Sequence, residues 1–235
     1  MDNLWHHQSQ DFFAGLESQK KNFLSQAQRR IYKKNDIIFF EGDRGNSCFY
    51  VTTGLIRIFS ISESGKEPIF FLRRPGEIFG LSEVLNDYPR KANAQAIAPS
   101  EVYCMNSKDF DAFLSHDYMM ARRVITMLGA RIRHLGDTVS NLVSSTVMAR
   151  LIKLLISLAC DQLTDAETWT SPISIDMCLS QEQMAAMTGS TQPTVSDLLQ
   201  QLKKAGLVTI AHRKITLNNP LQLLAEIETI TCEKS

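Results

Sequence analysis

Hydrophobic and polar positions follow three different patterns along the chain. Between residues 33 and 107, short runs of apolar and β-branched residues are separated by glycines, at roughly the 8 to 12 residues expected between strands of a barrel or roll. The runs are too short for helices, and glycine readily adopts turn conformations. We therefore expect a β domain, with turns at Gly42, Gly54, Gly65, Gly76 and Gly80.

A long helical pattern follows, from about Asp117 to Asn141. Apolar residues recur at alternating intervals of four and three, which is the a/d spacing of a coiled-coil seam, and charged residues lie off the seam. We expect residues 117–144 to form a dimerisation helix, although the same stripe could instead pack on the protein's own β domain. The predicted interface residues are Ile125, Leu128, Ile132, Leu135, Val139 and Leu142.

The remaining pattern predicts a helix-turn-helix over residues 179–202. Ser180 begins an S-x-x-Q capping box for the first helix, and residues 188–190 form a glycine turn. Thr191 can cap the second helix, where Pro193 is tolerated because first-turn amides have no intrahelical partner. The second helix would bury one apolar stripe, formed by Val195, Leu198, Leu199 and Leu202.

Burial of that stripe turns short and polar side chains outward, as in a helix that contacts base edges. Two short strands, LVTI and KITL, follow as a wing. The alternative is an ordinary helical hairpin inside a larger all-α domain. The predicted DNA contacts are Ser180, Thr191, Gln192, Pro193, Thr194, Ser196, Asp197, Gln200, Lys203, Arg213 and Lys214.

The length of 235 residues allows more than one domain. Residues 144–146 predict a break before an apolar helix over 147–160, which leads into a polar loop over 161–172. We therefore expect segments 1–116, 117–144 and 145–235. The net charge is zero, and acidic residues slightly outnumber basic ones after Thr146, which predicts weak non-specific DNA binding.

Composition excludes several protein classes. No apolar run reaches the roughly 18 residues needed to span a bilayer, and the first residues lack a signal-peptide pattern, so we expect a cytoplasmic protein that does not contact membranes. The five cysteines are scattered without a C-x-x-C pair, which argues against disulfides and zinc sites.

These three parts, in this order, resemble the CRP/FNR family of bacterial transcription regulators. The resemblance covers residues 20–218 and rests on EGDRGNSCFYVTTGLIRIF, RPGEIFG, PRKANAQA and the helix-turn-helix. It implies an α+β fold with an N-terminal cyclic-nucleotide-binding-like β roll, a dimerisation helix and a C-terminal winged helix-turn-helix. It also implies a homodimer on a pseudo-palindromic promoter site in double-stranded DNA, a small effector bound near the dimer helices, and contact with RNA polymerase.

The effector motif departs from the family pattern. Cyclic-nucleotide-binding members show F-G-E-L, whose Glu holds the ribose, and P-R-[AS]-A-[TS], whose Arg neutralises the phosphate. Here FGLS and PRKAN stand in those places, so Arg90 is retained and the carboxylate is lost. Leu135 and Gly136 replace the Thr-Ser pair that meets adenine. Since unpaired ribose and base groups would each cost about 1 to 3 kcal/mol, cyclic AMP is disfavoured.

We expect a small organic anion at this site instead, held by Arg90 and Lys91. The alternative is that Arg90 makes only a structural ion pair. Glu83 lies two positions beyond the place of the lost ribose-binding carboxylate, and we do not presume that it replaces that carboxylate. The predicted effector-binding residues are Gly80, Leu81, Ser82, Glu83, Arg90, Lys91, Asn93, Leu135 and Gly136.

Other sensing chemistries fit the sequence less well. An iron-sulfur cluster would need cysteines near the N-terminus, and the first is Cys48. A haem would need an axial ligand such as His134, His6, His7 or Cys104, so haem or redox sensing is an alternative that nothing favours. An enzyme site in the β roll, or a binding module without DNA recognition, are further alternatives. No catalytic or metal-ligand arrangement occurs at useful spacing, so we expect neither catalysis nor a metal.

The recognition helix also departs from the family. In the family, the residues that usually contact bases are a Glu one residue before a Thr of this helix and an Arg three residues after that Thr. The Thr is Thr194 in this chain, and Pro193 and Asp197 take the places of the Glu and the Arg. Asp cannot donate to guanine but can accept from cytosine N4, while Gln192 and Gln200 can pair with adenine. We therefore expect an unusual half-site. The alternative is that Asp197 bonds only within the protein and DNA shape supplies specificity.

Overall fold

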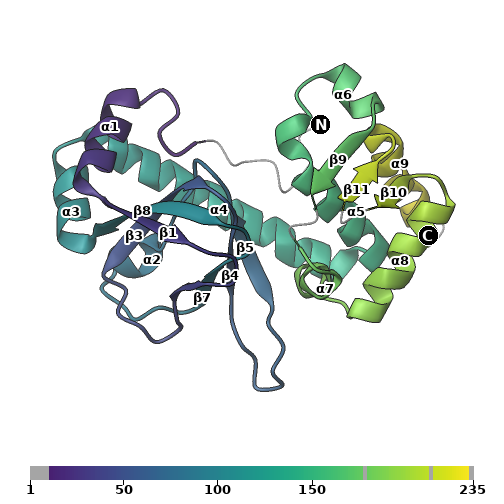
Figure 1. Cartoon of the computed structure of the whole chain (residues 1–235), viewed down its shortest axis with the longest axis horizontal. Coiled ribbons are helices and arrows are strands. Elements are labelled where there is room, and N and C mark those ends of the chain that lie inside the picture. The colour runs from purple at the N-terminus through teal and green to yellow at the C-terminus, as the bar shows by residue number, and fades with distance from the viewer. Residues whose placement is uncertain (1–10, 177–178, 212–213, 233–235) are drawn as a thin grey trace. The chain divides into compact units, whose positions relative to one another are not determined.

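The computed structural model describes residues 11–176, 179–211 and 214–232 (Figure 1). Contacts divide the chain into two compact units, one ending at Ile132 and the other beginning at Arg133. This division falls inside one long helix. The predicted segments 1–116, 117–144 and 145–235 follow secondary structure instead, and they stay a prediction.

The first unit is a β roll, as the glycine-punctuated pattern predicted (Figure 1). Within the described residues it contains two antiparallel four-stranded sheets. The first sheet has the order β1 (Gln28–Tyr32), β8 (Ser100–Asn106), β3 (Ser47–Thr53) and β6 (Ile78–Phe79). The second has the order β2 (Ile37–Phe39), β7 (Asn93–Ala96), β4 (Ile56–Phe59) and β5 (Ile69–Arg73).

Gly54 shows why glycine is needed at these turns. It joins β3 to β4 with a φ of 93°, in the left-handed region that residues with a Cβ rarely adopt. A Cβ built there would lie 2.1 Å from Ser100 Oγ and 2.5 Å from the Pro99 carbonyl oxygen. The tight turn lets the chain pass from one sheet to the other.

Two groups of buried side chains form the core of the roll. One group lies between the two sheets and includes the stacked rings of Phe49 and Phe79, whose centroids are 5.0 Å apart. The other joins the first sheet to α1 (Glu17–Gln26), α2 (Leu81–Val84) and α3 (Ser107–Ser115) through Phe23, Leu81 and Phe110. The helices therefore cover the sheet face that would otherwise expose apolar residues to water.

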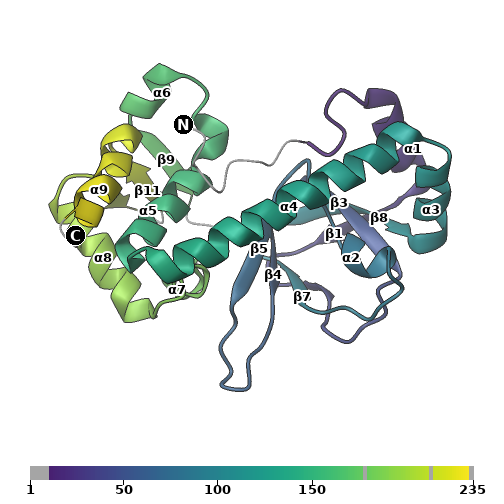
Figure 2. The ribbon, with the colours of Figure 1, turned by 180° about the vertical axis from the view of Figure 1, so that it is seen from behind.

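The long helix α4 (Tyr118–Ser144) confirms the predicted helical pattern (Figure 2). Met120 and Val124 are buried in the core of the roll, and Leu128 packs partly against it. Most of the predicted seam faces outward instead, since Ile125 and Ile132 are 71% and 69% exposed. Three further seam residues are also exposed: Leu135, Val139 and Leu142.

The second unit is a winged helix-turn-helix (Figure 1). Helix α5 (Val147–Leu158) precedes it, and α7 (Gln181–Thr188) and α8 (Gln192–Lys204) form the motif itself. A three-stranded antiparallel sheet with the order β10 (Val208–Ala211), β11 (Lys214–Leu217), β9 (Ile173–Asp176) contains the predicted wing strands. Helix α9 (Pro220–Cys232) packs on α5 and on α6 (Ala166–Thr170).

The prediction of a loop over residues 161–172 was wrong, because helices η1 (Cys160–Gln162) and α6 (Ala166–Thr170) form in this segment. Asp165 begins α6 with a capping box to Thr168, and Trp169 is buried. Only two buried apolar side chains, Leu163 and Trp169, anchor an otherwise polar segment, and two positions are too few to show a helical period. In the described parts of the chain, no helix combines the length and the apolar character needed to cross a membrane.

Candidate DNA-binding and effector sites

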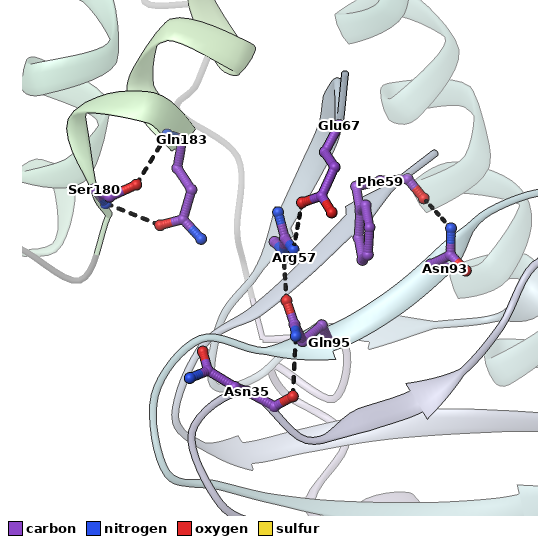
Figure 3. Close-up of polar contacts among 8 residues, drawn as sticks. All are labelled: Asn35, Arg57, Phe59, Glu67, Asn93, Gln95, Ser180 and Gln183. Carbon is purple, nitrogen blue, oxygen red and sulfur yellow. Dashed lines mark hydrogen bonds and ion pairs between the residues drawn. The ribbon is translucent and has the colours of Figure 1, made fainter. Parts of the chain in front are cut away.

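The two helices of the motif begin and end as their sequence predicts. Ser180 and Gln183 form a reciprocal capping box: Ser180 Oγ accepts from the Gln183 amide at 3.1 Å, and Gln183 Oε1 accepts from the Ser180 amide at 2.9 Å (Figure 3). Gly189 ends α7 with a φ of 59°. Thr191 caps α8 by accepting from the Thr194 amide. These local bonds set the turn between the two helices.

Helix α8 presents the predicted polar face. Val195, Leu199 and Leu202 are buried, and Leu198 is half-buried, so the opposite face of the helix lies in solvent. The exposed residues on it are Gln192, Pro193, Asp197, Gln200 and Lys203, while Thr194 and Ser196 are half-buried. Among the described residues, Asp197 forms no hydrogen bond or ion pair, so its carboxylate is available to an external donor.

Three predicted DNA contacts at the start of α8 already have protein partners. Gln192 Nε2 donates to Gln181 Oε1 at 3.2 Å, which links α8 to the first turn of α7. The hydroxyls of Thr191 and Thr194 lie 2.8 Å apart. Sequence reasoning missed Gln181, because a single glutamine after a cap carries no periodic signal.

Basic residues lie at the end of α8 and beside the wing. Lys203 and Lys204 are exposed in the last turn of α8, where they also oppose the negative end of the helix dipole. Lys214 is exposed at the start of β11. Arg213, another predicted contact, lies outside the described residues. These lysines place positive charge near a helix face that carries Asp197.

Arg150 is a structural residue that the sequence analysis did not single out. It is 9% exposed, and its guanidinium donates to the carbonyls of Thr188 at 2.7 Å and Ser145 at 2.6 Å. A longer contact of 3.4 Å reaches the Leu142 carbonyl. Thr188 ends α7 and Ser145 follows α4, so Arg150 joins the end of the long helix to the helix-turn-helix. Burial lowers the pKa of Arg150.

Arg90 lies deep in the β roll and already has a carboxylate partner. It is 2% exposed, and its Nη1 lies 3.0 Å from Glu83 Oε2. The guanidinium also donates to the carbonyls of Gly80 and Ser47, while its Nε is buried without a partner in the described structure. This is the structural ion pair that the sequence left open as an alternative to anion binding.

Gly80 makes this arrangement possible. Its φ is 75°, and an added Cβ would lie 2.9 Å from Arg90 Nη1 and 3.2 Å from the Ser47 carbonyl oxygen. The backbone must therefore approach the guanidinium more closely than any other residue type allows.

The other predicted effector residues of the roll have varied environments. Leu81 is fully buried in the core, and Asn93 is buried with its side chain bonded to the Glu41 amide and the Phe59 carbonyl (Figure 3). Ser82 and Lys91 are exposed. Leu135 and Gly136 belong to the second unit and are exposed on α4.

Two more buried arginines lie in the second sheet. Arg57 on β4 pairs with Glu67 at 2.7 Å and donates to Gln95, and its guanidinium lies over the Phe59 ring (Figure 3). Arg73, at the end of β5, pairs with Glu77 at 3.1 Å. Each of these cations thus has one carboxylate of its own.

Arg131, on α4, differs from these arginines. Its side chain is half-buried and its guanidinium donates to the Ile78 carbonyl, but within the described structure it forms no ion pair. Burial and the nearby charge of Arg73 lower the pKa of Arg131, and Glu77 opposes them. Arg73 Nε is buried and lacks a partner in the described structure. Sequence reasoning did not connect Arg131 with the strand that accepts its hydrogen bond, because Arg131 and Ile78 are far apart along the chain.

The cysteines and histidines in the part of the chain that the structure describes belong to no group that could hold a metal ion. Cys48 and Cys104 are buried, and burial raises the pKa of Cys48 strongly. No group of three or more potential metal ligands occurs there. His6 and His7 lie outside the described residues.

Comparison with known proteins identifies both units. Residues 29–117 match the cyclic nucleotide-binding domain family, and residues 149–226 match the Crp-like helix-turn-helix domain family. The chain is 27% identical to the cyclic AMP receptor protein of Thermus thermophilus over 216 residues, which cover 92% of this chain and 95% of that protein. It is 26% identical to the global nitrogen regulator of a Nostoc species over 194 residues, which cover 82% and 86%.

A solved structure gives the same result. FixK2 from Bradyrhizobium japonicum superposes with a TM-score of 0.73 at 25% identity, covering 86% of this chain and 96% of that one. The effector-binding domain, the long helix and the DNA-binding domain therefore occur here in the order of regulators that bind DNA as dimers. The chain belongs to the CRP/FNR family of transcription regulators.

Proposed function

We propose that this protein is a homodimeric, sequence-specific DNA-binding regulator controlled by a small organic anion other than cyclic AMP, bound in its β roll. The observation that carries the DNA part is the solvated polar face of α8, on which Asp197 has no partner among the described residues. Regulation at a promoter further implies contact with RNA polymerase.

The residues around Arg90 support an effector other than cyclic AMP. Leu81 stands where cyclic-nucleotide-binding members have their ribose-binding Glu, and its side chain is buried in the core. Glu83 meanwhile neutralises Arg90, the residue that would hold the cyclic phosphate. A cyclic nucleotide would therefore lack its ribose acceptor and would have to compete with a carboxylate for its phosphate donor.

The exposed seam of α4 supports the homodimer. Ile125, Ile132 and Val139 recur at heptad-like spacing and are all more than half exposed in the single chain. Two such helices would bury these side chains against each other, as in a coiled coil. The dimer would then place two copies of α8 on a two-fold related DNA site.

The face of α8 predicts a half-site that lacks the family's usual G-specific contact. The carboxylate of Asp197 can accept from cytosine N4 but cannot donate to guanine. The amides of Gln192 and Gln200 suit adenine.

Selection from random-sequence duplexes tests this function. The full-length protein should enrich a two-fold symmetric site, and Asp197→Arg should shift the enriched half-site toward G. Glu167→Arg is the matched control, since it makes the same charge change at an exposed residue of α6. It should strengthen non-specific binding without altering the site. If no sequence is enriched with or without cell extract, the protein is not a sequence-specific regulator.

An unchanged site for Asp197→Arg would have a narrower meaning. DNA recognition would stand, but Asp197 would not contact bases, and specificity would rest on other residues or on DNA shape.

A further inference from the structure

A hydrogen bond between two glutamines joins the two helices of the helix-turn-helix. Gln181 is the first residue of α7 and Gln192 is the first residue of α8, 11 positions further along the chain. Gln192 Nε2 donates to Gln181 Oε1 at 3.2 Å. Gln192 is exposed on the polar face of α8, whereas Gln181 is half-buried. A side chain of the recognition face is therefore already held by a residue of the other helix.

The backbone is well fixed at both ends of this bond. Gln181 follows Ser180, whose capping box with Gln183 sets the first turn of α7 (Figure 3). Gln192 lies between the helix cap Thr191 and a proline, whose ring restricts the backbone of the first turn of α8. Side-chain torsions are thus the main freedom left to the two glutamines, and the hydrogen bond restricts them further.

The orientation of the Gln192 amide decides which base it can contact. A glutamine amide has two N–H donors and one carbonyl acceptor. In the major groove, adenine presents an acceptor and a donor, whereas guanine presents two acceptors. An amide that turns freely can offer a donor and an acceptor to adenine, or both donors to guanine.

The bond to Gln181 removes one of these two options. It occupies one N–H of Gln192, which leaves the second N–H and the carbonyl oxygen Oε1. This remaining pair matches adenine, and it lacks the second donor that guanine requires. Gln192 can therefore contact adenine while its bond to Gln181 stays in place.

We propose that Gln181 is a positioning residue that determines DNA specificity. It holds the Gln192 amide so that Gln192 accepts adenine and rejects guanine at one position of each half-site. This inference rests on the proposed DNA-binding function. It adds to that function a residue of α7 that controls base selection through its partner on α8.

Binding of the full-length protein to paired duplexes tests this role. Both duplexes carry the site that the parent protein selects, with adenine or guanine at the position whose preference Gln192→Ala abolishes. We expect the parent to prefer adenine by about tenfold or more. Gln181→Ala should lower that ratio to about threefold or less, because the freed amide can offer both donors to guanine. Preferences at other positions of the site should not change.

Two further substitutions reverse or keep the polarity of the bond. Gln181→Glu keeps an acceptor for Gln192 Nε2 and should keep the preference for adenine. Gln181→Lys offers only donors, so it would bond to Gln192 Oε1, leave both N–H groups free and move the preference toward guanine. Glu182→Gln is the matched control, since it makes the same charge change at the neighbouring exposed residue. It should strengthen binding to both duplexes alike.

A double-mutant cycle separates positioning from a general structural effect. In a Gln192→Ala background, no change at Gln181 should alter the ratio for the two duplexes, because the amide that Gln181 holds is gone. Thermal unfolding of Gln181→Ala should match that of the parent, since alanine is favourable in a helix.

Several results would overturn the proposal. An unchanged ratio in Gln181→Ala shows that Gln181 does not position Gln192, and the same is true if Gln181→Lys keeps the parent's preference. Equal effects of Gln181→Ala with and without Gln192 show that Gln181 acts on its own. These results contradict this inference alone, whereas a parent protein that selects no site contradicts the proposed function as well.

Discussion

Replacing Arg150 by Met should destabilise the C-terminal unit by about 3 kcal/mol. The guanidinium makes two short hydrogen bonds, to the carbonyls of Thr188 and Ser145, and one long contact to that of Leu142. A hydrogen bond from a charged donor contributes roughly 1.5 to 3 kcal/mol, and we take the lower value for each short bond because the guanidinium loses hydration on burial. Met preserves much of the apolar stem, so the loss of hydrogen bonds dominates.

A single tryptophan can report this unit alone. The chain has two tryptophans, and a Trp5→Phe background leaves Trp169, which is buried on α6 of the C-terminal unit. Urea titration followed by its fluorescence then measures the free energy of unfolding of that unit. Arg150→Lys should lose part of the stability, because one ammonium group cannot reproduce the planar fork of guanidinium donors.

Lys204→Met provides the control for removing a cation. Lys204 is exposed at the end of α8, and its loss should change the free energy of unfolding by less than about 0.5 kcal/mol. A loss below about 1 kcal/mol for Arg150→Met would refute the reasoning, since two buried carbonyls would then have found other partners.

Three other predictions concern the dimer, the β roll and its response to acid. Val139→Glu should yield monomers in sedimentation experiments, because it puts a charge in the α4 seam, whereas Arg133→Glu, off the seam, should stay dimeric. Gly80→Ala should cost about 1 to 3 kcal/mol in thermal unfolding, because of its positive φ and its closeness to Arg90; an unchanged transition would contradict that strain. Burial raises the pKa of the Asp11 carboxyl, but hydrogen bonds from a lysine, a backbone amide and a tyrosine outweigh burial and lower that pKa. The ionised carboxylate therefore stabilises the fold above about pH 4, and this stabilisation is lost as the pH falls through the pKa of the folded state. Asp11→Asn should therefore be less stable than the parent protein at pH 7 and lose less stability in acid. A free energy of unfolding that falls as steeply with decreasing pH as that of the parent would contradict this.

Local signals in the sequence predicted the helix-turn-helix well. The capping box at Ser180, the left-handed Gly189 and the cap at Thr191 each depend on residues no more than four positions apart. The same is true of the turn at Gly54, although the close contact with Ser100 that requires glycine there was invisible. Propensities and caps act within one turn of backbone, so sequence patterns report them directly.

Long-range polar contacts were not predictable in the same way. Arg150 stands in a largely apolar helical pattern, and nothing nearby in sequence indicates that the Thr188 carbonyl, 38 positions away, accepts from it. A structural ion pair at Arg90 was open as an alternative without a named partner, and only the fold shows that Glu83 lies 3.0 Å from it. Charge balance in the interior depends on which side chains share a buried place.

The sequence by itself thus determined the order of the parts: a β roll, a long helix with an apolar seam and a winged helix-turn-helix with an unusual recognition face. Each part follows from short-range periodicity, turn residues and caps. The tertiary structure decided that the buried Arg57, Arg73 and Arg90 each pair with a glutamate, since ion pairing depends on distances between side chains in the folded chain.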